Sequence, residues 1–296
     1  MKVFETLDLA WIKTAYESLN KSRALVDRIE YKLAGLSPAF TEVFALVVSI
    51  GSRPHGILPL CRIKDRVEVL GQYWGEGYRL PVSEESFLRM HEWLENNKLM
   101  LEYSLDALPG MSEMEDRQAF LPLPSRSTLS WYVGLFQESK KDKQIIDEAL
   151  KYEKTIGYNV KGVFTLEDIS LLKRLAFGRL GAESRFENED FLASFVGVLG
   201  YLKRISALRV VTFYGKDKKV GIMFLLDDMI ERRVTFLSGF YEPELNGFGK
   251  HMYYRLVDVA GRLNAAEIVA MMPVNRIKRV MMYQGRLLYE MRRNIN

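Results

Sequence analysis

Cysteine and histidine are scarce in this chain, which holds one cysteine and three histidines among its 296 residues. A single thiol, Cys61, excludes an intrachain disulfide and any metal site built from several cysteines. The histidines His55, His91 and His251 are scattered and show no metal-ligand spacing, so we expect no metal. Cys61 ends an apolar run, residues 56–61, and this position predicts a buried strand thiol rather than a nucleophile.

Long apolar runs and low-complexity tracts are also missing from the sequence. No stretch approaches the roughly 20 uncharged apolar residues that span a bilayer, so we expect no membrane span. The segment 1–8 carries acidic residues where a secretory signal needs an uninterrupted apolar run, which favours a cytoplasmic protein. The composition, 48% hydrophobic and 27% charged, is typical of globular proteins, and the length predicts two domains.

Charge is unevenly distributed along the chain. Residues 1–146 hold 18 basic and 20 acidic residues, a net charge of −2, whereas residues 147–296 hold 24 basic and 18 acidic residues, a net charge of +6. A basic second half suits an anionic ligand, although a soluble basic surface has the same composition.

The pattern of the first half alternates helices and strands. We predict a helix over Leu9–Ala34, and Ser83 caps a second helix that ends near Asn96. The β-branched and apolar runs predict strands at Glu42–Ile50, His55–Ile63, Arg66–Leu70 and Lys98–Ser104.

The second half follows a blurred copy of the same order. A helix at Lys140–Tyr152 connects the two halves. The first helix predicted after it runs from Thr165 towards Gly178, and the others are Glu189–Leu202, Gly249–Leu263 and Val274–Tyr283. The predicted strands are Tyr158–Phe164, Leu208–Tyr214, Val220–Leu226, Arg232–Ser238, Glu267–Met272 and Arg286–Arg292. A strand predicted at Ser127–Leu135 precedes the connecting helix and belongs to the first half. The partial duplication predicts two related α/β domains, residues 1–145 and 146–296.

One segment, Arg232–Lys250, carries a pattern with chemical meaning. A strand is expected to end at Ser238 and Gly239, and Gly247 and Gly249 then open a helix. Glycines there let a ligand approach the backbone, and the free N–H groups of a helix N-terminus bind a pyrophosphate. An ordinary loop shows the same pattern, since a single Gly-x-Gly is not specific.

The turn Glu244–Gly249 with its flanking helix and strand resembles the phosphate-binding turn of the GNAT superfamily of acyl-CoA N-acyltransferases. That turn usually reads Gln/Arg-x-x-Gly-x-Gly/Ala, so Glu244 departs from it, and a carboxylate near pyrophosphate is repulsive. Within the superfamily the layout is similar to tandem-domain proteins of the CelD/BcsL-like or Fem type. The resemblance implies two tandem GNAT-like domains, each with a mixed, mostly antiparallel sheet flanked by helices.

The resemblance also implies residues for the donor, which would be acetyl-CoA or another acyl-CoA. Asn275 and Tyr283 follow the family pattern of an Asn and a later Tyr, whose hydroxyl protonates the departing thiolate. Tyr283 also fits a core position. Asp228 is our candidate for the group that accepts the amine proton, although with its neighbours it also fits a solvated hairpin tip. The implied donor-binding residues are Ser238, Gly239, Asn246, Gly247, Phe248, Gly249, Lys250 and Asn275.

Aromatic residues gather in one glycine-rich loop of the first half. Tyr73, Trp74 and Tyr78 are interleaved with glycines, and we predict that this loop shapes the acceptor pocket; a packed interdomain loop is the alternative. The function implied is transfer of an acyl group from acyl-CoA to an amine of a small molecule or sugar. Two alternatives remain open, a Fem-like transferase that uses aminoacyl-tRNA and a non-catalytic ligand-binding protein on the same fold.

Overall fold

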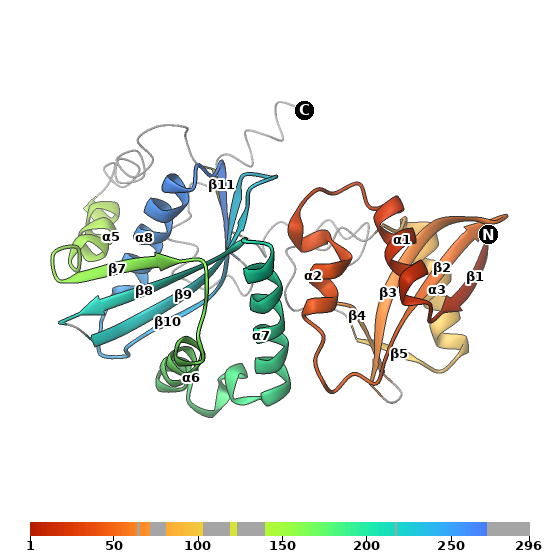
Figure 1. Cartoon of the computed structure of the whole chain (residues 1–296), viewed down its shortest axis with the longest axis horizontal. Coiled ribbons are helices and arrows are strands. Elements are labelled where there is room, and N and C mark those ends of the chain that lie inside the picture. The colour runs from red at the N-terminus through yellow and green to blue at the C-terminus, as the bar shows by residue number, and fades with distance from the viewer. Residues whose placement is uncertain (64–65, 72–80, 103–118, 123–139, 217, 271–296) are drawn as a thin grey trace. The chain divides into compact units, whose positions relative to one another are not determined.

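The computed structural model describes residues 1–63, 66–71, 81–102, 119–122, 140–216 and 218–270 (Figure 1). The chain divides into two compact units. The first comprises residues 1–115 and 189–201, and the second comprises residues 116–188 and 202–296.

The first unit is built around a five-stranded sheet of order β1-β2-β3-β4-β5. Neighbouring strands are antiparallel except for β4 and β5, which are parallel. The strands are β1 (Lys2–Thr6), β2 (Glu42–Ile50), β3 (Arg53–Ile63), β4 (Arg66–Val69) and β5 (Met100–Glu102). The helices are α1 (Leu9–Leu19), the short 3-10 turn η1 (Leu25–Asp27), α2 (Ile29–Ala34) and α3 (Glu84–Asn96).

Strand β2 shows how the sequence builds this unit. Its side chains alternate between the two faces of the sheet, as the pleat requires. One face of the strand contributes Phe44, Leu46 and Val48 to the hydrophobic cluster that includes Phe87 and Met90 of α3. The alternate residues of the strand pack in a separate cluster with residues of α1 and α2, and buried Cys61 belongs to that cluster as well. Burial raises the pKa of the Cys61 thiol, which confirms the expectation of a structural cysteine.

The second unit contains a six-stranded sheet of order β6-β11-β10-β9-β8-β7. Within it β10 and β11 are parallel and every other pairing is antiparallel. The strands are β6 (Ala119–Pro122), β7 (Ile156–Lys161), β8 (Leu208–Gly215), β9 (Lys218–Asp228), β10 (Arg233–Tyr241) and β11 (Glu267–Ala270). The helices and 3-10 turns are α5 (Lys140–Leu150), α6 (Leu166–Leu180), η4 (Gly181–Glu183), η5 (Arg185–Glu187) and α8 (Phe248–Arg262). Helix α7 (Glu189–Arg204) follows η5 in the sequence, but residues 189–201 of it belong to the first unit.

Helix α8 is deeply enclosed in the second unit. It packs against α5, β10 and β11, and Met252, Leu256 and Ala260 are among its core residues. Helix α6 packs against β9 and β10. Because only one stripe of a surface helix is normally apolar, the burial of 11 of the 15 residues of α8 shows that it is covered on more than one side.

The order of elements is the same in the two halves of the sequence. Each runs strand, two helices, three antiparallel strands, helix and a final strand parallel to the one before it, from β1 to β5 and from β7 to β11. Duplicated mixed sheets flanked by helices are the fold class expected from the sequence, and the structure confirms it.

Helix α7 joins the first unit although it lies in the second half of the sequence. The Ser194 hydroxyl donates to the backbone oxygen of Gly35, at 2.6 Å. Gly197 approaches the carbonyl oxygen of Ala34 so closely that a Cβ atom on it would lie under 3.0 Å away. Glycine is the one residue that permits such a backbone approach.

The single helix expected over Leu9–Ala34 is wrong, because α1 ends at Leu19 and α2 begins only at Ile29. Two further strands, β1 and β6, were not expected from the sequence. The hairpin strands and the helices capped by Ser83 and Thr165 are confirmed, and Thr165 forms a full capping box with Asp168. The elements expected at Ser127–Leu135, Val274–Tyr283 and Arg286–Arg292 lie outside the described residues.

Candidate active site

The glycine turn singled out in the sequence forms the N-terminus of α8. Gly247 is the N-cap residue, with φ of +81°, and no side chain caps the helix. The N–H groups of Phe248 and Lys250 donate to Leu245 O and Gly247 O. Among the described residues, the N–H groups of Gly247 and Gly249 meet no hydrogen-bond acceptor. Two free N–H groups at a helix N-terminus are suited to bind an anion.

Phe248 anchors this turn to the sheet. Its side chain is fully buried, and its ring meets Tyr152, Phe213 and Tyr241 edge to face, with centroids 5.2 to 5.4 Å apart. Gly221 on β9 leaves room for the ring, since a Cβ atom there would lie 3.2 Å from Phe248. The side chain of Phe248 therefore fixes the position of the turn, and the Phe248 N–H group is already bonded to Leu245 O. The role of Phe248 in holding the donor stays a prediction from the sequence.

Two residues that the sequence did not single out contact the turn. The Tyr152 hydroxyl donates to the backbone oxygen of Asn246, at 2.7 Å. Glu148 on α5 forms an ion pair with Lys250, and its Oε2 lies 3.5 Å from where a Cβ atom on Gly247 would be. Both contacts join residues about a hundred positions apart, so no local pattern indicates them.

Charge around the turn is mixed. Lys250 lies in the first turn of α8, which contains no acidic residue, and Glu148 balances its charge. Glu244 is solvent-exposed. Solvent and salt screen an exposed carboxylate, so its repulsion of a bound pyrophosphate is weaker than the sequence implied.

Strand β10 leads from the sheet to this turn. A register shift against β9 falls between Phe236 and Ser238, and the parallel pairing with β11 extends from Arg233 to Phe236. The strand was expected to end at Ser238 and Gly239, which is wrong, because it continues to Tyr241. Ser238 and Gly239 therefore lie within the strand, after the irregularity, on the stretch that approaches the turn.

Asp228 lies at the other end of β9. It pairs in register with Arg233, whereas Gly221, beside the turn, pairs with Tyr241. Gly221 and Asp228 are seven positions apart, which corresponds to about 23 Å of extended strand. The Asp228 Oδ1 accepts the N–H groups of Ile230 and Glu231 and so closes the hairpin turn. The structure does not bring Asp228 to the turn.

Five predicted site residues lie outside the described residues: Asn275, Tyr283, Tyr73, Trp74 and Tyr78. Their roles stay predictions from the sequence.

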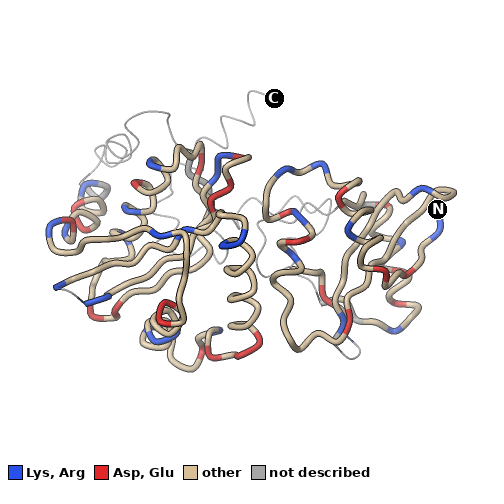
Figure 2. The backbone as a smooth tube through the Cα atoms, in the orientation of Figure 1, with Lys and Arg blue, Asp and Glu red and all other residues tan. Residues whose placement is uncertain are grey.

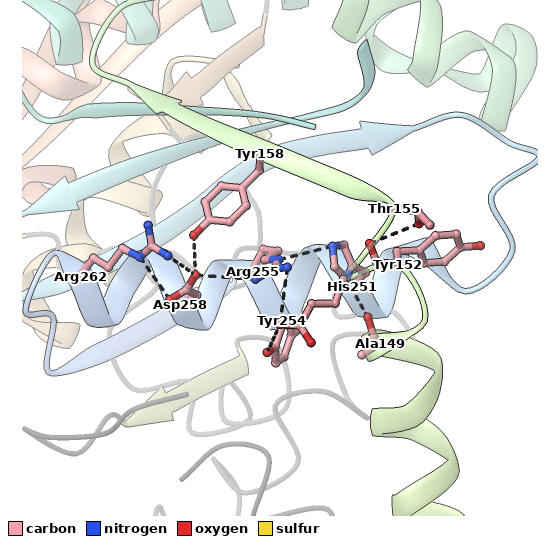
Figure 3. A network of polar contacts seen from close by, with 10 residues as sticks. Ala149, Tyr152, Thr155, Tyr158, His251, Tyr254, Arg255, Asp258 and Arg262 are labelled. Atoms are coloured by element: carbon pink, nitrogen blue, oxygen red, sulfur yellow. Dashed lines mark hydrogen bonds and ion pairs between the residues drawn. The ribbon is translucent and has the colours of Figure 1, made fainter. Parts of the chain in front are cut away.

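Figure 3 shows a polar network along α8 that begins beside the turn. His251 is fully buried, and its Nδ1 donates to Ala149 O at 2.7 Å, which leaves Nε2 to accept the Arg255 Nε–H at 3.5 Å. Further along the helix, Asp258 accepts from Tyr158 of β7 and from Arg262. These bonds fix α8, and hence its N-terminus, to α5 and to β7.

The buried His251 predicts a loss of stability in acid. Burial, reinforced by the charge of Arg255, lowers the pKa of His251 to about 4. In the unfolded chain this imidazole gains a proton near pH 6.5. Between these values the unfolded state binds more protons, so the free energy of unfolding falls as the pH falls. We expect it to be about 2 kcal/mol lower at pH 5 than at pH 7 from this residue.

Urea unfolding of the wild type and of His251→Gln at both pH values checks this expectation. The variant cannot titrate at this position, so its stability deficit relative to the wild type should shrink by about 2 kcal/mol at pH 5. An unchanged deficit would contradict it.

The described residues contain no group of three or more His, Cys, Asp or Glu side chains arranged to hold a metal. In the same part of the chain, no helix is both long and apolar enough to cross a bilayer.

Comparison with solved structures identifies the fold. A tandem GNAT protein from the clavulanic acid biosynthesis pathway superposes with a TM-score of 0.51 at 10% sequence identity, over 96% of this chain and 94% of that one. The chain has the tandem GNAT fold. A conserved protein of unknown function from Bacteroides thetaiotaomicron VPI-5482 matches equally well, with a TM-score of 0.51, 11% identity and coverage of 96% and 95%. FemX gives a TM-score of 0.49 at 10% identity, over 92% of this chain and 89% of that one.

No protein-family model matches the sequence, and neither does any curated protein. In each repeat the third strand of the antiparallel set precedes a helix, β4 before α3 and β10 before α8, so these two helices can be compared.

Proposed function

We propose that this tandem GNAT protein transfers an acyl group from an acyl-CoA to an amine of a small molecule or sugar, and that the donor binds at the N-terminus of α8. The contrast between the two equivalent helices carries the proposal. In the first repeat Ser83 caps α3 by accepting the Ser86 N–H at 3.2 Å, and Glu85 adds an acid to the first turn. In the second repeat the N-cap is Gly247, and the first turn contains Lys250 and no acid.

The uncapped N-terminus of α8 therefore suits an anion better than the N-terminus of α3, although Glu148 balances the charge of Lys250. The helix dipole attracts negative charge at either N-terminus. At α3 the Ser83 side chain already accepts the N–H group of Ser86, whereas at α8 the N–H groups of Gly247 and Gly249 meet no acceptor among the described residues. This supports the second repeat as the donor-binding one.

The chemistry that we propose at the thioester is the one implied by the resemblance to the GNAT superfamily. A neutral amine attacks the thioester carbonyl, the thiolate leaves, and a hydroxyl that shares its proton with the sulfur favours the step. Tyr283 is our proposed proton donor, and Asn275 our proposed donor-binding residue after β11. Asp228 stays the candidate base by resemblance alone, since its position on the hairpin adds no support.

Thermal unfolding with a panel of ligands tests the proposal. We expect acetyl-CoA, a longer acyl-CoA or CoA to raise Tm by several degrees at about 100 times its Kd, because a ligand that binds only the folded state stabilises it. Pantetheine, which lacks the pyrophosphate, is the matched control and should leave Tm unchanged.

Two outcomes would overturn the proposal. Salt-sensitive binding of aminoacyl-tRNA without any response to CoA would favour the Fem-like alternative. Among the described residues, basic and acidic positions alternate along the backbone of both units (Figure 2), whereas a tRNA surface is expected to be broadly positive. A response to neither class of donor would favour a non-catalytic protein.

A further inference from the structure

Tyr152 stands apart from the other residues near the turn because it bonds to the backbone of the turn itself. It lies just beyond α5 and is 8% exposed, and its hydroxyl donates to Asn246 O at 2.7 Å. Its ring meets Phe248 edge to face at 5.2 Å and His251 at 6.0 Å. A ring packed on two sides is held in place, so the direction of its hydroxyl is fixed.

The acceptor of this hydrogen bond belongs to the peptide unit between Asn246 and Gly247. In a planar trans peptide the C=O of one residue and the N–H of the next point in opposite directions. A bond that holds Asn246 O towards Tyr152 therefore points the Gly247 N–H away from the aromatic cluster. This N–H is one of the two that meet no acceptor in the part of the chain that the structure describes.

The same peptide unit is unusually free to rotate. Gly247 has φ of +81°, and glycine populates positive and negative φ about equally well. If the unit flipped, the partly negative carbonyl oxygen would take the place of the N–H group and would repel an anionic ligand. The hydrogen bond to Tyr152 is the contact that selects one orientation.

We propose that Tyr152 is a positioning residue of the donor site, whose hydroxyl fixes the Asn246–Gly247 peptide so that the Gly247 N–H faces the pyrophosphate of the donor. The inference rests on the proposed function for the identity of the anion. Tyr152 touches neither substrate nor reacting atoms, and it acts through the turn.

A matched control for Tyr152 lies on α8, the helix that the turn opens. The Tyr254 hydroxyl of α8 donates to Glu153 Oε1 at 3.1 Å and so also ties α8 to the segment after α5. Tyr152→Phe and Tyr254→Phe each remove one hydroxyl and one hydrogen bond between the same two parts of the chain. Only the first bond reaches the backbone of the turn.

The experiment measures the Kd of inorganic pyrophosphate and of CoA for the wild type and both variants by calorimetry. We expect Tyr152→Phe to raise both Kd values about tenfold, the scale of one hydrogen bond, and Tyr254→Phe to change them less than twofold. In acyl-transfer assays the KM for acyl-CoA should rise in Tyr152→Phe while kcat stays near that of the wild type. A 15N-glycine spectrum should show the Gly247 amide shifting with pyrophosphate in the wild type and losing that response in Tyr152→Phe.

The outcomes separate this inference from the proposed function. If the wild type binds CoA and Tyr152→Phe binds it equally well, the inference fails and the function stands. An equal loss of CoA affinity in Tyr152→Phe and Tyr254→Phe overturns the inference as well, because it indicates a general loosening of α8. Pyrophosphate binding that depends on Tyr152, without binding of any acyl-CoA, overturns the function and supports the inference. If the wild type binds neither pyrophosphate nor any acyl-CoA, both the inference and the proposed function fail.

Discussion

Gly247→Asp is expected to weaken acyl-CoA binding by about 100-fold. The new carboxylate would lie at the N-cap of α8, where aspartate accepts hydrogen bonds from the same N–H groups that the donor pyrophosphate needs. It would also repel the phosphates directly, and two like charges about 4 Å apart near a protein surface repel by about 4 kcal/mol. Calorimetry with CoA measures the loss.

Gly247→Asn is the control for this experiment. Asparagine matches aspartate in shape, and both tolerate the left-handed conformation that φ of +81° requires, so the two variants share the same backbone strain. Only the charge differs between them. We expect Gly247→Asn to bind CoA within about tenfold of the wild type. Equal affinities for the two variants would show that the anion does not bind at this turn.

The elements that the sequence predicted well are those marked by local chemistry. Ser83 and Thr165 cap helices in both sequence and structure, because a hydroxyl before an amphipathic run is a local signal. A run of β-branched and apolar residues likewise located β2, whose predicted and observed bounds agree. Local signals of this kind need no knowledge of the rest of the chain.

The break between α1 and α2 was missed because side chains cause it, and neither glycine nor proline marks it. Asn20 donates from its side chain to Asp27 O at 2.9 Å, and Ser22 bonds the Asp27 carboxylate. Glu17 accepts the Ile29 N–H at 3.1 Å. Such bonds offer the backbone an alternative to the helix, but the same residue types also occur on exposed helix faces. Strands β1 and β6 were missed because they are short and gain their stability from distant partners.

In the candidate site, too, local signals were read correctly from the sequence and long-range contacts were missed. The turn Glu244–Gly249 was found from its glycines and its place between a strand and a helix, both of which are local. Tyr152 and Glu148 were not found, because their contacts with the turn depend on how α5 packs on α8. The sequence located the N–H groups, and tertiary packing determines which way they point.

Gly197→Ala is expected to lower the free energy of unfolding by about 3 kcal/mol or more, the upper range for overpacking a rigid contact. The added Cβ would lie under 3.0 Å from the carbonyl oxygen of Ala34, at the end of α2. A backbone atom cannot turn aside as a flexible side chain does, so α7 would have to shift. Such a shift would also break the bond between Ser194 and Gly35, three residues earlier on α7.

Gly200→Ala separates this clash from the general effect of alanine in a helix. Gly200 lies on α7 one turn after Gly197, and a Cβ atom there would meet nothing within 4 Å. Alanine is favoured over glycine inside a helix by about 1 kcal/mol, so this variant should be slightly more stable than the wild type. Urea unfolding of both variants therefore gives changes of opposite sign if α7 packs tightly on the end of α2. A stabilisation by Gly197→Ala similar to that by Gly200→Ala would contradict that packing, because helix propensity alone would then account for both.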